Sequence, residues 1–202
     1  MIGPGEVLGG SAEQEPKGQP RIYVASLSDY NAGILHGTWL EAAVDVEELY
    51  AGISQMLATS PTARPWGEPA EEWAIHDYEG LGDVRLGEYE PIERVAHLAQ
   101  GIARHGEAFA AWWANDPPTG EPEEGEEAFT DAYQGEWPSM VDYGEQLLED
   151  IGVDLERLGE LPELLRAYLT FDIDAWVRDM EIGGDIYTTE SSSGGIHIFW
   201  NR

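Results

Sequence analysis

The sequence predicts a mixed α+β fold built from three small units, on two observations. Strand-like runs of aliphatic and aromatic residues occur near both ends of the chain, whereas the centre carries apolar residues at helical spacing. Stretches rich in Pro, Gly and Glu separate these parts. We expect a flexible tail over residues 1–20, an N-terminal α+β domain over 21–90, a small helical domain with an acidic loop over 91–127, and a C-terminal α+β domain over 128–202.

The N-terminal unit is predicted to be a small antiparallel sheet with one helix. Strands are expected over residues 22–25, 34–40 and 73–78, with a turn over 28–33 after the first of them. Asp45 is the predicted N-cap of the helix, because Glu48 follows three residues later. The buried face of this helix is expected to consist of the apolar residues at helical spacing, Val46, Leu49, Tyr50, Ile53 and Leu57.

The central unit is predicted to be helical. Pro91 suits the first turn of a helix, whose apolar face would consist of Ile92, Val95, Ala96, Ala99 and Ile102. A shorter helix that carries Phe109, Trp112 and Trp113 is expected to pack against it. The Pro-, Gly- and Glu-rich residues 116–127 are expected to form an exposed loop.

The C-terminal unit is predicted to combine helices with a terminal β-hairpin. One helix is expected over residues 140–151, followed by Gly152, which is a favourable residue just after a helix. A second helical stretch would run from Pro162 towards Met180, with a break near Asp172. Residues 186–189 and 196–200 flank the turn-forming residues 191–195, a pattern typical of a hairpin.

The charge balance restricts the function classes. The 202 residues include 40 Asp and Glu against 10 Lys and Arg, which gives a formal net charge of −30. Such a surface repels nucleic acid and anionic membranes and attracts basic grooves. The 8 Trp and 9 Tyr exclude a disordered acidic tail, because such tails are poor in aromatic residues. Halophilic adaptation and selection for solubility would also produce an acidic surface, and both halophily and a GC-rich genome would fit the single lysine, Lys17.

The acidic residues are concentrated in segments. Residues 115–160 contain fifteen acidic residues and one basic residue, Arg157. Asp142, Glu145 and Glu149 fall on one face of the predicted helix, with Glu145 and Glu149 about 6 Å apart along its axis. Two nucleotide steps on one DNA strand cover about 6.8 Å, so carboxylates on a helix can approximate a row of phosphates. Most charged helix faces, however, are simply solvated.

No motif for catalysis or metal binding stands out. The absence of cysteine excludes disulfides, thiolate catalysis and Cys-based zinc sites, and is compatible with a cytoplasmic location. The five histidines, His36, His76, His97, His105 and His197, are too scattered to indicate a shared metal site. The N-terminal residues do not resemble a secretory signal, and no run of about 18 apolar residues occurs. We therefore expect a cytoplasmic protein with no catalytic residues, metal or cofactor and no membrane span.

Three blocks of the sequence resemble the ArdA antirestriction proteins, in the same order and with similar spacing. The first block is IYVASLSDYNAG at residues 22–33 with GTW at 37–39. The second is EEWAIHDYE at residues 71–79 with EYE at 88–90, and the third is LPELLRAY at residues 161–168 with DAWVRDM at 174–180. The chain departs from the family in its tail before Arg21 and around residues 116–127. Before Arg178 the family pattern has an aromatic residue followed by glycine, whereas this chain has Trp176 followed by Val177.

The resemblance implies an elongated, three-domain homodimer whose acidic surface imitates bent B-form DNA, encoded on mobile genetic elements. It implies a non-enzymatic competitor that occupies the DNA groove of a type I restriction–modification enzyme, on its methyltransferase core, and does not itself bind nucleic acid. The partner-binding surface is expected to be distributed over Asp77, Glu79, Glu88, Glu90, Glu93, Asp142, Glu145, Glu149 and Asp150. Two alternatives are an acidic protein that sequesters another basic DNA-binding protein, and an undetected hydrolase or metal-binding enzyme.

Overall fold

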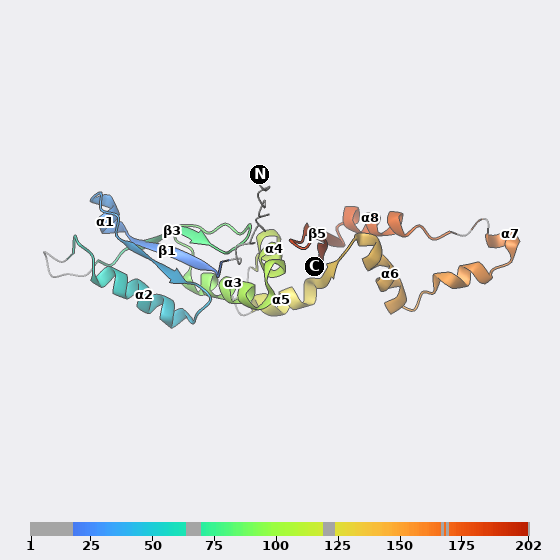
Figure 1. The fold of residues 1–202 in the computed structure, drawn as a ribbon, viewed down its shortest axis with the longest axis horizontal. Helices are drawn as coiled ribbons and strands as arrows, with labels where there is room; N and C mark the ends of the chain where they lie inside the picture. Colours follow the sequence, from blue (N-terminus) through green and yellow to red (C-terminus); the bar gives the residue numbers. More distant parts are fainter. Residues whose placement is uncertain (1–17, 64–69, 119–123, 167, 169, 202) are drawn as a thin grey trace, which may run out of the picture.

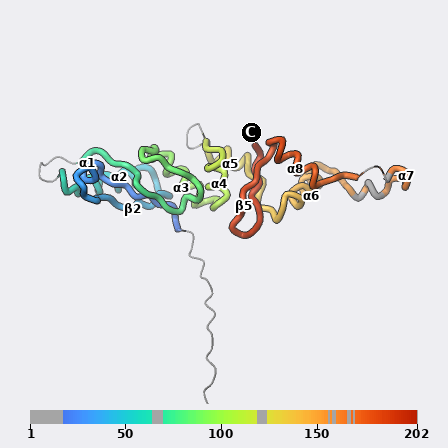
Figure 2. The backbone as a smooth tube through the Cα atoms, turned by 90° about the horizontal axis from the view of Figure 1, so that it is seen from above, coloured from blue at the N-terminus to red at the C-terminus, as the bar shows by residue number. Residues whose placement is uncertain are grey.

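The protein is an elongated α+β molecule. The computed structural model describes residues 18–63, 70–118, 124–166, 168 and 170–201. Figure 1 shows its elements spread along one long axis, with helices α1 (Leu27–Asn31) and α2 (Val46–Ala58) near one end and helix α7 (Glu163–Arg166) at the other. The view turned by 90° in Figure 2 shows the same extended course. The elongation expected from the family resemblance is thus present in the single chain.

The N-terminal sheet has three antiparallel strands in the order β2-β1-β3. They are β1 (Arg21–Ser26), β2 (Gly37–Glu41) and β3 (Trp73–Glu79), which confirms the first and third predicted strands. The second strand begins only at Gly37, so the prediction was wrong for residues 34–36. The reason is that Ile34 N–H donates back to the Asp29 carbonyl, which keeps this segment in the connection that precedes the strand.

The predicted turn over residues 28–33 is also corrected, because most of it is the short helix α1. Ser26 caps this helix, with its hydroxyl accepting from the Asp29 N–H at 3.4 Å. The helix ends at Asn31, and Gly33 then adopts φ +77°, a conformation that glycine takes without strain. The Gly and Asn that suggested a turn therefore mark only the end of the segment.

Helix α2 begins at the predicted N-cap, Asp45, although the Asp45 side chain makes no capping hydrogen bond. Leu49, Ile53 and Leu57 are buried as predicted, and so is Met56. Tyr50 was wrongly placed on the buried face, since it is 42% exposed. Its hydroxyl donates instead to the Glu93 carboxylate at 3.0 Å, so the ring bridges two segments at the surface.

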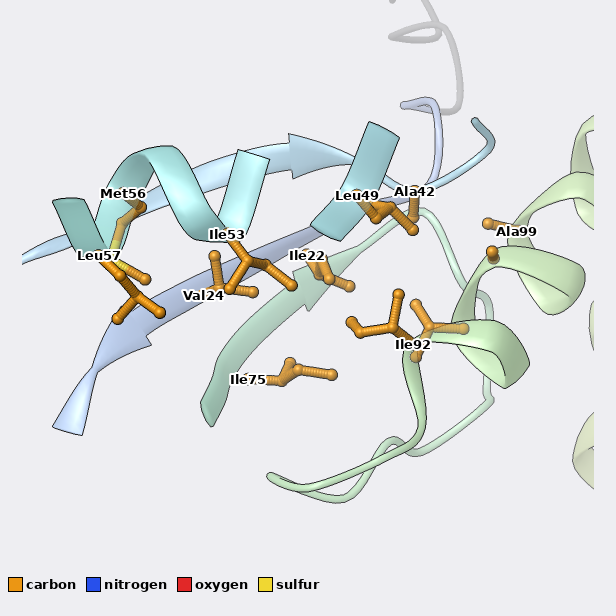
Figure 3. Packing of buried hydrophobic residues seen from close by; sticks show 12 residues of the cluster. Ile22, Val24, Ala42, Leu49, Ile53, Met56, Leu57, Ile75, Ile92 and Ala99 are labelled. Atoms are coloured by element: carbon orange, nitrogen blue, oxygen red, sulfur yellow. The ribbon is translucent and has the colours of Figure 1, made fainter. Parts of the chain in front are cut away.

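The first hydrophobic cluster lies between the N-terminal sheet and two helices. Figure 3 shows Ile22 and Val24 from β1 and Ile75 from β3 beneath Leu49 and Ile53 of α2. Helix α3 (Ile92–His105) closes this cluster with its predicted apolar residues, Ile92, Val95, Ala96 and Ala99. Apolar residues at helical and strand spacing thus meet in one core, which includes a helix that the sequence pattern assigned to the central unit.

The second cluster is aromatic and joins the central helices to the C-terminal sheet. It contains Phe109, Trp112 and Trp113 of helix α4 (Glu107–Asn115), together with Phe129 of helix α5 (Glu124–Ala132) and Phe199. Helix α4 was predicted, and it packs on α3. Helix α5 was not predicted. Glu124 to Glu127 form the first turn of α5, so the loop prediction for 116–127 was wrong there, and residues 119–123 lie outside the described residues.

The C-terminal sheet has the order β4-β6-β5, with all pairs antiparallel. The predicted hairpin is confirmed as β5 (Ile186–Glu190) and β6 (Ile196–Trp200). Strand β4 (Tyr133–Trp137) was not predicted, because Gln, Gly and Glu interrupt its apolar alternation. The hairpin follows α7 in the sequence, but it folds back towards the middle of the molecule (Figure 1).

The remaining C-terminal helices extend away from this sheet. Helix α6 (Met140–Asp150) confirms its prediction, and Gly152 has φ +79° just after it. The helical stretch expected after Pro162 consists of two helices, α7 and α8 (Ile173–Gly183), with the 3-10 helix η2 (Leu155–Glu160) before them. The predicted break near Asp172 is confirmed, since the Asp172 carboxylate accepts from the Ala175 N–H and caps α8.

The described residues therefore form a mixed α+β protein with eight α-helices and two small antiparallel sheets. A third hydrophobic cluster contains Tyr143, Met180, Ile186 and Ile198 and lies among α6, α8 and the terminal hairpin. Helix α3 contributes to both the first and the second cluster, so the division of the chain into domains at residue 90 stays a prediction. No helix in the described ranges combines the length and apolar character needed to span a bilayer.

Candidate acidic interface

The carboxylates of this protein lie at its surface along the whole described chain. Among the acidic side chains that the structure describes, only Asp29 is buried, and Glu90, Glu107 and Glu126 are partly buried. All the others are exposed. The large negative charge is therefore presented to solvent, where it can act on a basic partner.

Helix α6 carries four of the predicted site residues. Its buried side consists of Tyr143, Gly144 and Leu148, while Asp142, Glu145, Glu149 and Asp150 are all exposed. Ser139 caps the helix by accepting from the Asp142 N–H at 3.2 Å, which fixes where the helix begins. The spacing of the acids along one helix face is thus as predicted, and their contact with a partner stays a prediction.

Asp77 and Glu79 lie on β3, which is an edge strand of the N-terminal sheet. A register shift opposite Tyr23 and Val24 interrupts the alternation, so that Ile75 is buried whereas Asp77 and Glu79 are both exposed. Arg21 donates to Glu79 through Nε at 2.8 Å and Nη2 at 2.5 Å. Glu79 is therefore partly neutralised within the chain, while the Asp77 carboxylate accepts from the neighbouring Tyr78 N–H.

Glu88, Glu90 and Glu93 lie around the start of α3. The Ile75 N–H donates to the Glu88 carbonyl at 2.9 Å, which holds this segment against β3. Glu90 forms an ion pair with Arg94 at 3.0 Å. Partial burial, together with the hydrogen bond to the Glu93 carboxylate, raises the pKa of Tyr50. The structure thus brings five predicted acids together near β3 and α3, and places the other four separately on α6 (Figure 1).

Other carboxylates, not singled out in the sequence, act inside the molecule. Glu107 at the start of α4 accepts hydrogen bonds from the Ser192 N–H at 2.9 Å and from the Ser192 hydroxyl at 2.8 Å. Glu136 of β4 accepts from the Ser191 hydroxyl at 2.5 Å, and the hydroxyls of Ser191 and Ser193 hold its pKa below the usual range. These contacts fasten the loop of the terminal hairpin to α4 and β4.

Buried groups complete this junction. His197 is 4% exposed, and its Nδ1 shares a hydrogen bond of 3.0 Å with the Tyr133 hydroxyl. Its Nε2 lies 3.6 Å from the Glu107 carboxylate. Burial raises the pKa of Tyr133, and the Glu136 and Glu107 carboxylates raise it further. The serine run, which the sequence pattern indicated only as a turn, is thus a hydrogen-bonding surface for two glutamates.

Asp29 is the buried exception. Its Oδ1 accepts from the Thr62 N–H at 2.9 Å, which ties α1 to the loop after α2. Burial by itself raises the pKa of Asp29, but hydrogen bonds from Ser60, Thr62 and Ser26 outweigh burial and hold the pKa well below its usual range. Asp29 is therefore an internal structural residue, and it is not available to a partner.

The described residues contain no group of three or more His, Asp or Glu side chains placed to hold a metal ion. His105, one of the five scattered histidines, contacts Glu126 at 3.0 Å. Arg104 also contacts Glu126, so the end of α3 is fastened to α5. The hydrogen bond from His105 and the charge of Arg104 lower the pKa of Glu126, although burial opposes them.

An elongated α+β scaffold with exposed carboxylates along its length defines an acidic protein suited to a basic partner surface. A comparison with family models identifies the kind of protein more closely. The model described as "Antirestriction protein (ArdA)" matches residues 22–193. The chain belongs to this family of antirestriction proteins, which confirms the resemblance seen in the sequence. A search of curated proteins finds no match.

Proposed function

We propose that this protein is a non-enzymatic inhibitor that occupies the DNA-binding groove of a type I restriction–modification enzyme. Its surface carboxylates would replace DNA phosphates opposite the Lys and Arg side chains of the groove. One observation carries this proposal beyond the family: the exposed acids follow the whole length of an elongated chain. A compact acidic protein would present far fewer of them along one direction.

The charge and its arrangement fit a duplex in scale. Duplex DNA carries one charge per about 1.7 Å, so a net charge of −30 matches about fifteen base pairs. The carboxylates are already arranged on folded elements, so little ordering entropy is lost on binding. The three-domain arrangement 21–90, 91–127 and 128–202 is kept as part of this proposal, although two of the three hydrophobic clusters contain residues from both sides of a proposed domain boundary.

Homodimerisation is a further part of the proposal, with a second copy bound at the end of the molecule that carries α7. Large apolar side chains are exposed in this region, and they are Ile151, Val153, Leu164, Leu165, Tyr168 and Phe171. Clustered exposed apolar residues mark interaction surfaces in soluble proteins. A two-fold contact at one end would double the length of the acidic surface, because both N-terminal parts would point away from the dimer axis.

Light scattering on a size-exclusion column tests the dimer. We expect twice the chain mass for the natural protein and the single-chain mass for Tyr168→Glu, because a carboxylate would be buried without a partner in the contact. A single-chain mass for the natural protein at micromolar concentration would contradict this part of the proposal alone, since groove occupation does not require the dimer.

We also propose that the protein acts in the cytoplasm. A gel-shift competition with purified components tests the inhibition itself. Purified type I methyltransferase core is bound to its labelled duplex, and this protein is added at two salt concentrations. We expect displacement of intact DNA that weakens as salt rises, because exposed charges are screened. The protein alone should neither shift nor cleave the duplex.

Two outcomes would contradict the proposal. Absence of displacement at micromolar protein would refute occupation of this groove. Equal displacement of an unrelated basic DNA-binding protein from its own duplex would favour a general acidic sequestering function.

A further inference from the structure

A surface pocket of about 520 Å³ lies beside the start of α3 in the N-terminal part. This volume is within the range of small-molecule and side-chain binding sites. Its lining combines three aromatic side chains with three carboxylates, and these are Tyr50, Trp73, Tyr89, Glu71, Glu72 and Glu90. No Lys, Arg or His belongs to its lining among the residues that the structure describes. The pocket is therefore both aromatic and strongly electronegative.

Backbone hydrogen bonds hold the walls of this pocket in place. The Leu27 N–H donates to the Glu72 carbonyl at 3.0 Å, which fixes the segment that enters β3. The Ile75 N–H donates to the Glu88 carbonyl at 2.9 Å, which fixes the segment that carries Tyr89. Tyr50 reaches the same region from α2. A preformed site of this kind loses little entropy when a ligand binds.

The carboxylates of Glu71 and Glu72 remain available. Glu90 forms an ion pair with Arg94, but within the described part of the chain neither Glu71 nor Glu72 has an ion-pair or side-chain hydrogen-bond partner. Tyr89 is 72% exposed, so most of its ring is open to solvent beside the pocket. The site thus presents an uncovered aromatic surface next to two unneutralised charges.

We propose that this pocket binds an arginine side chain of the basic partner protein. A guanidinium is planar, stacks on aromatic rings and binds carboxylates through two parallel hydrogen bonds. An ammonium lacks the planar face, so lysine fits less well. The proposal rests on the proposed function for the source of the arginine. It adds a local anchor to a distributed charge match, since aromatic and arginine residues dominate the energy of protein interfaces.

A substitution without charge change separates the anchor from charge matching. Tyr89→Ala is expected to weaken the displacement of DNA from the methyltransferase core by about tenfold, through the lost cation–π contact. Tyr30→Ala is the matched control, because Tyr30 is 57% exposed on α1 and does not line the pocket. Equal inhibition by Tyr89→Ala and the natural protein would overturn the proposal.

A second pair of variants removes the same charge at two different places. Glu71→Gln with Glu72→Gln removes two charges at the pocket, and Glu47→Gln with Glu48→Gln removes two exposed charges in the first turn of α2. We expect the pocket pair to lose several-fold more inhibition than the α2 pair. Equal losses would mean that only the number of charges matters.

A direct titration needs no restriction enzyme. The ¹⁵N-labelled full chain is titrated with N-acetyl-arginine amide, and separately with N-acetyl-lysine amide, at constant ionic strength set with NaCl. We expect saturable shifts at the Trp73 indole and the Tyr89 amide with arginine, several-fold weaker shifts with lysine, and loss of both in Tyr89→Ala. Identical responses to the two compounds, or shifts only at residues outside the pocket, would overturn the proposal that this pocket binds arginine. Saturable arginine binding without DNA displacement would instead refute only the proposed function.

Discussion

Phe109→Ala is expected to lower the free energy of unfolding by about 3–5 kcal/mol, the usual cost of removing a buried aromatic ring. Phe109 is 2% exposed, and its ring centroid lies 5.0 Å from that of Phe129 and 5.4 Å from that of Trp112. Phe129 in turn contacts Phe199 of the terminal hairpin. The substitution therefore removes the centre of the cluster that joins the central helices to the C-terminal sheet, and urea denaturation measures the loss.

Gly101 provides an internal check on this packing. A Cβ added at Gly101 would lie 2.2 Å from Cε1 of Phe109, so Gly101→Ala overfills the same site. Overpacking costs about 1–3 kcal/mol, and the cost should fall in the Phe109→Ala background because the methyl group then enters the cavity. Additive losses would contradict the packing. Leu35→Ala is the surface control, since Leu35 is 77% exposed and its loss should change stability by less than about 0.5 kcal/mol.

Neutralising the acids of α6 is expected to have the largest effect on function. The variant Asp142→Asn, Glu145→Gln, Glu149→Gln and Asp150→Asn keeps side-chain size and removes four exposed charges from one helix. Each exposed charge contact contributes about 0.2–1 kcal/mol, so the joint loss of about 0.8–4 kcal/mol should weaken competition with DNA by at least about fourfold. Each single substitution should change it by only a few-fold.

A matched variant decides whether placement or only net charge matters. Asp174→Asn, Asp179→Asn, Glu181→Gln and Asp185→Asn remove the same number of exposed charges on and after α8. If α6 contacts the groove, its variant loses more inhibition than this one in the same gel-shift competition. Equal losses would remove the special role of α6. Loss of all inhibition from one substitution, with the fold retained, would contradict a distributed surface.

Local patterns were sufficient for most of the secondary structure. The terminal hairpin, α2, α3 and α6 follow from spacing, proline and glycine positions, and capping residues, since these features act within a few residues of each other. Strand β4 and helix α5 were missed because their apolar residues are few. β4 is held by pairing with β6 and α5 by Phe129 in the aromatic cluster, both contacts between distant residues.

Composition and short motifs were enough to establish the charge, the α+β class and the family of this protein, because they need no knowledge of distant contacts. Which acids are free became evident only in the folded chain. Arg21 covers Glu79 from 58 residues away, and Ser192 covers Glu107 from 85 residues away. The pocket likewise joins Tyr50 of α2 to Glu72 and Tyr89. Ion pairs, burial and pockets depend on which segments the hydrophobic cores bring together, and that is fixed only when the whole chain has packed.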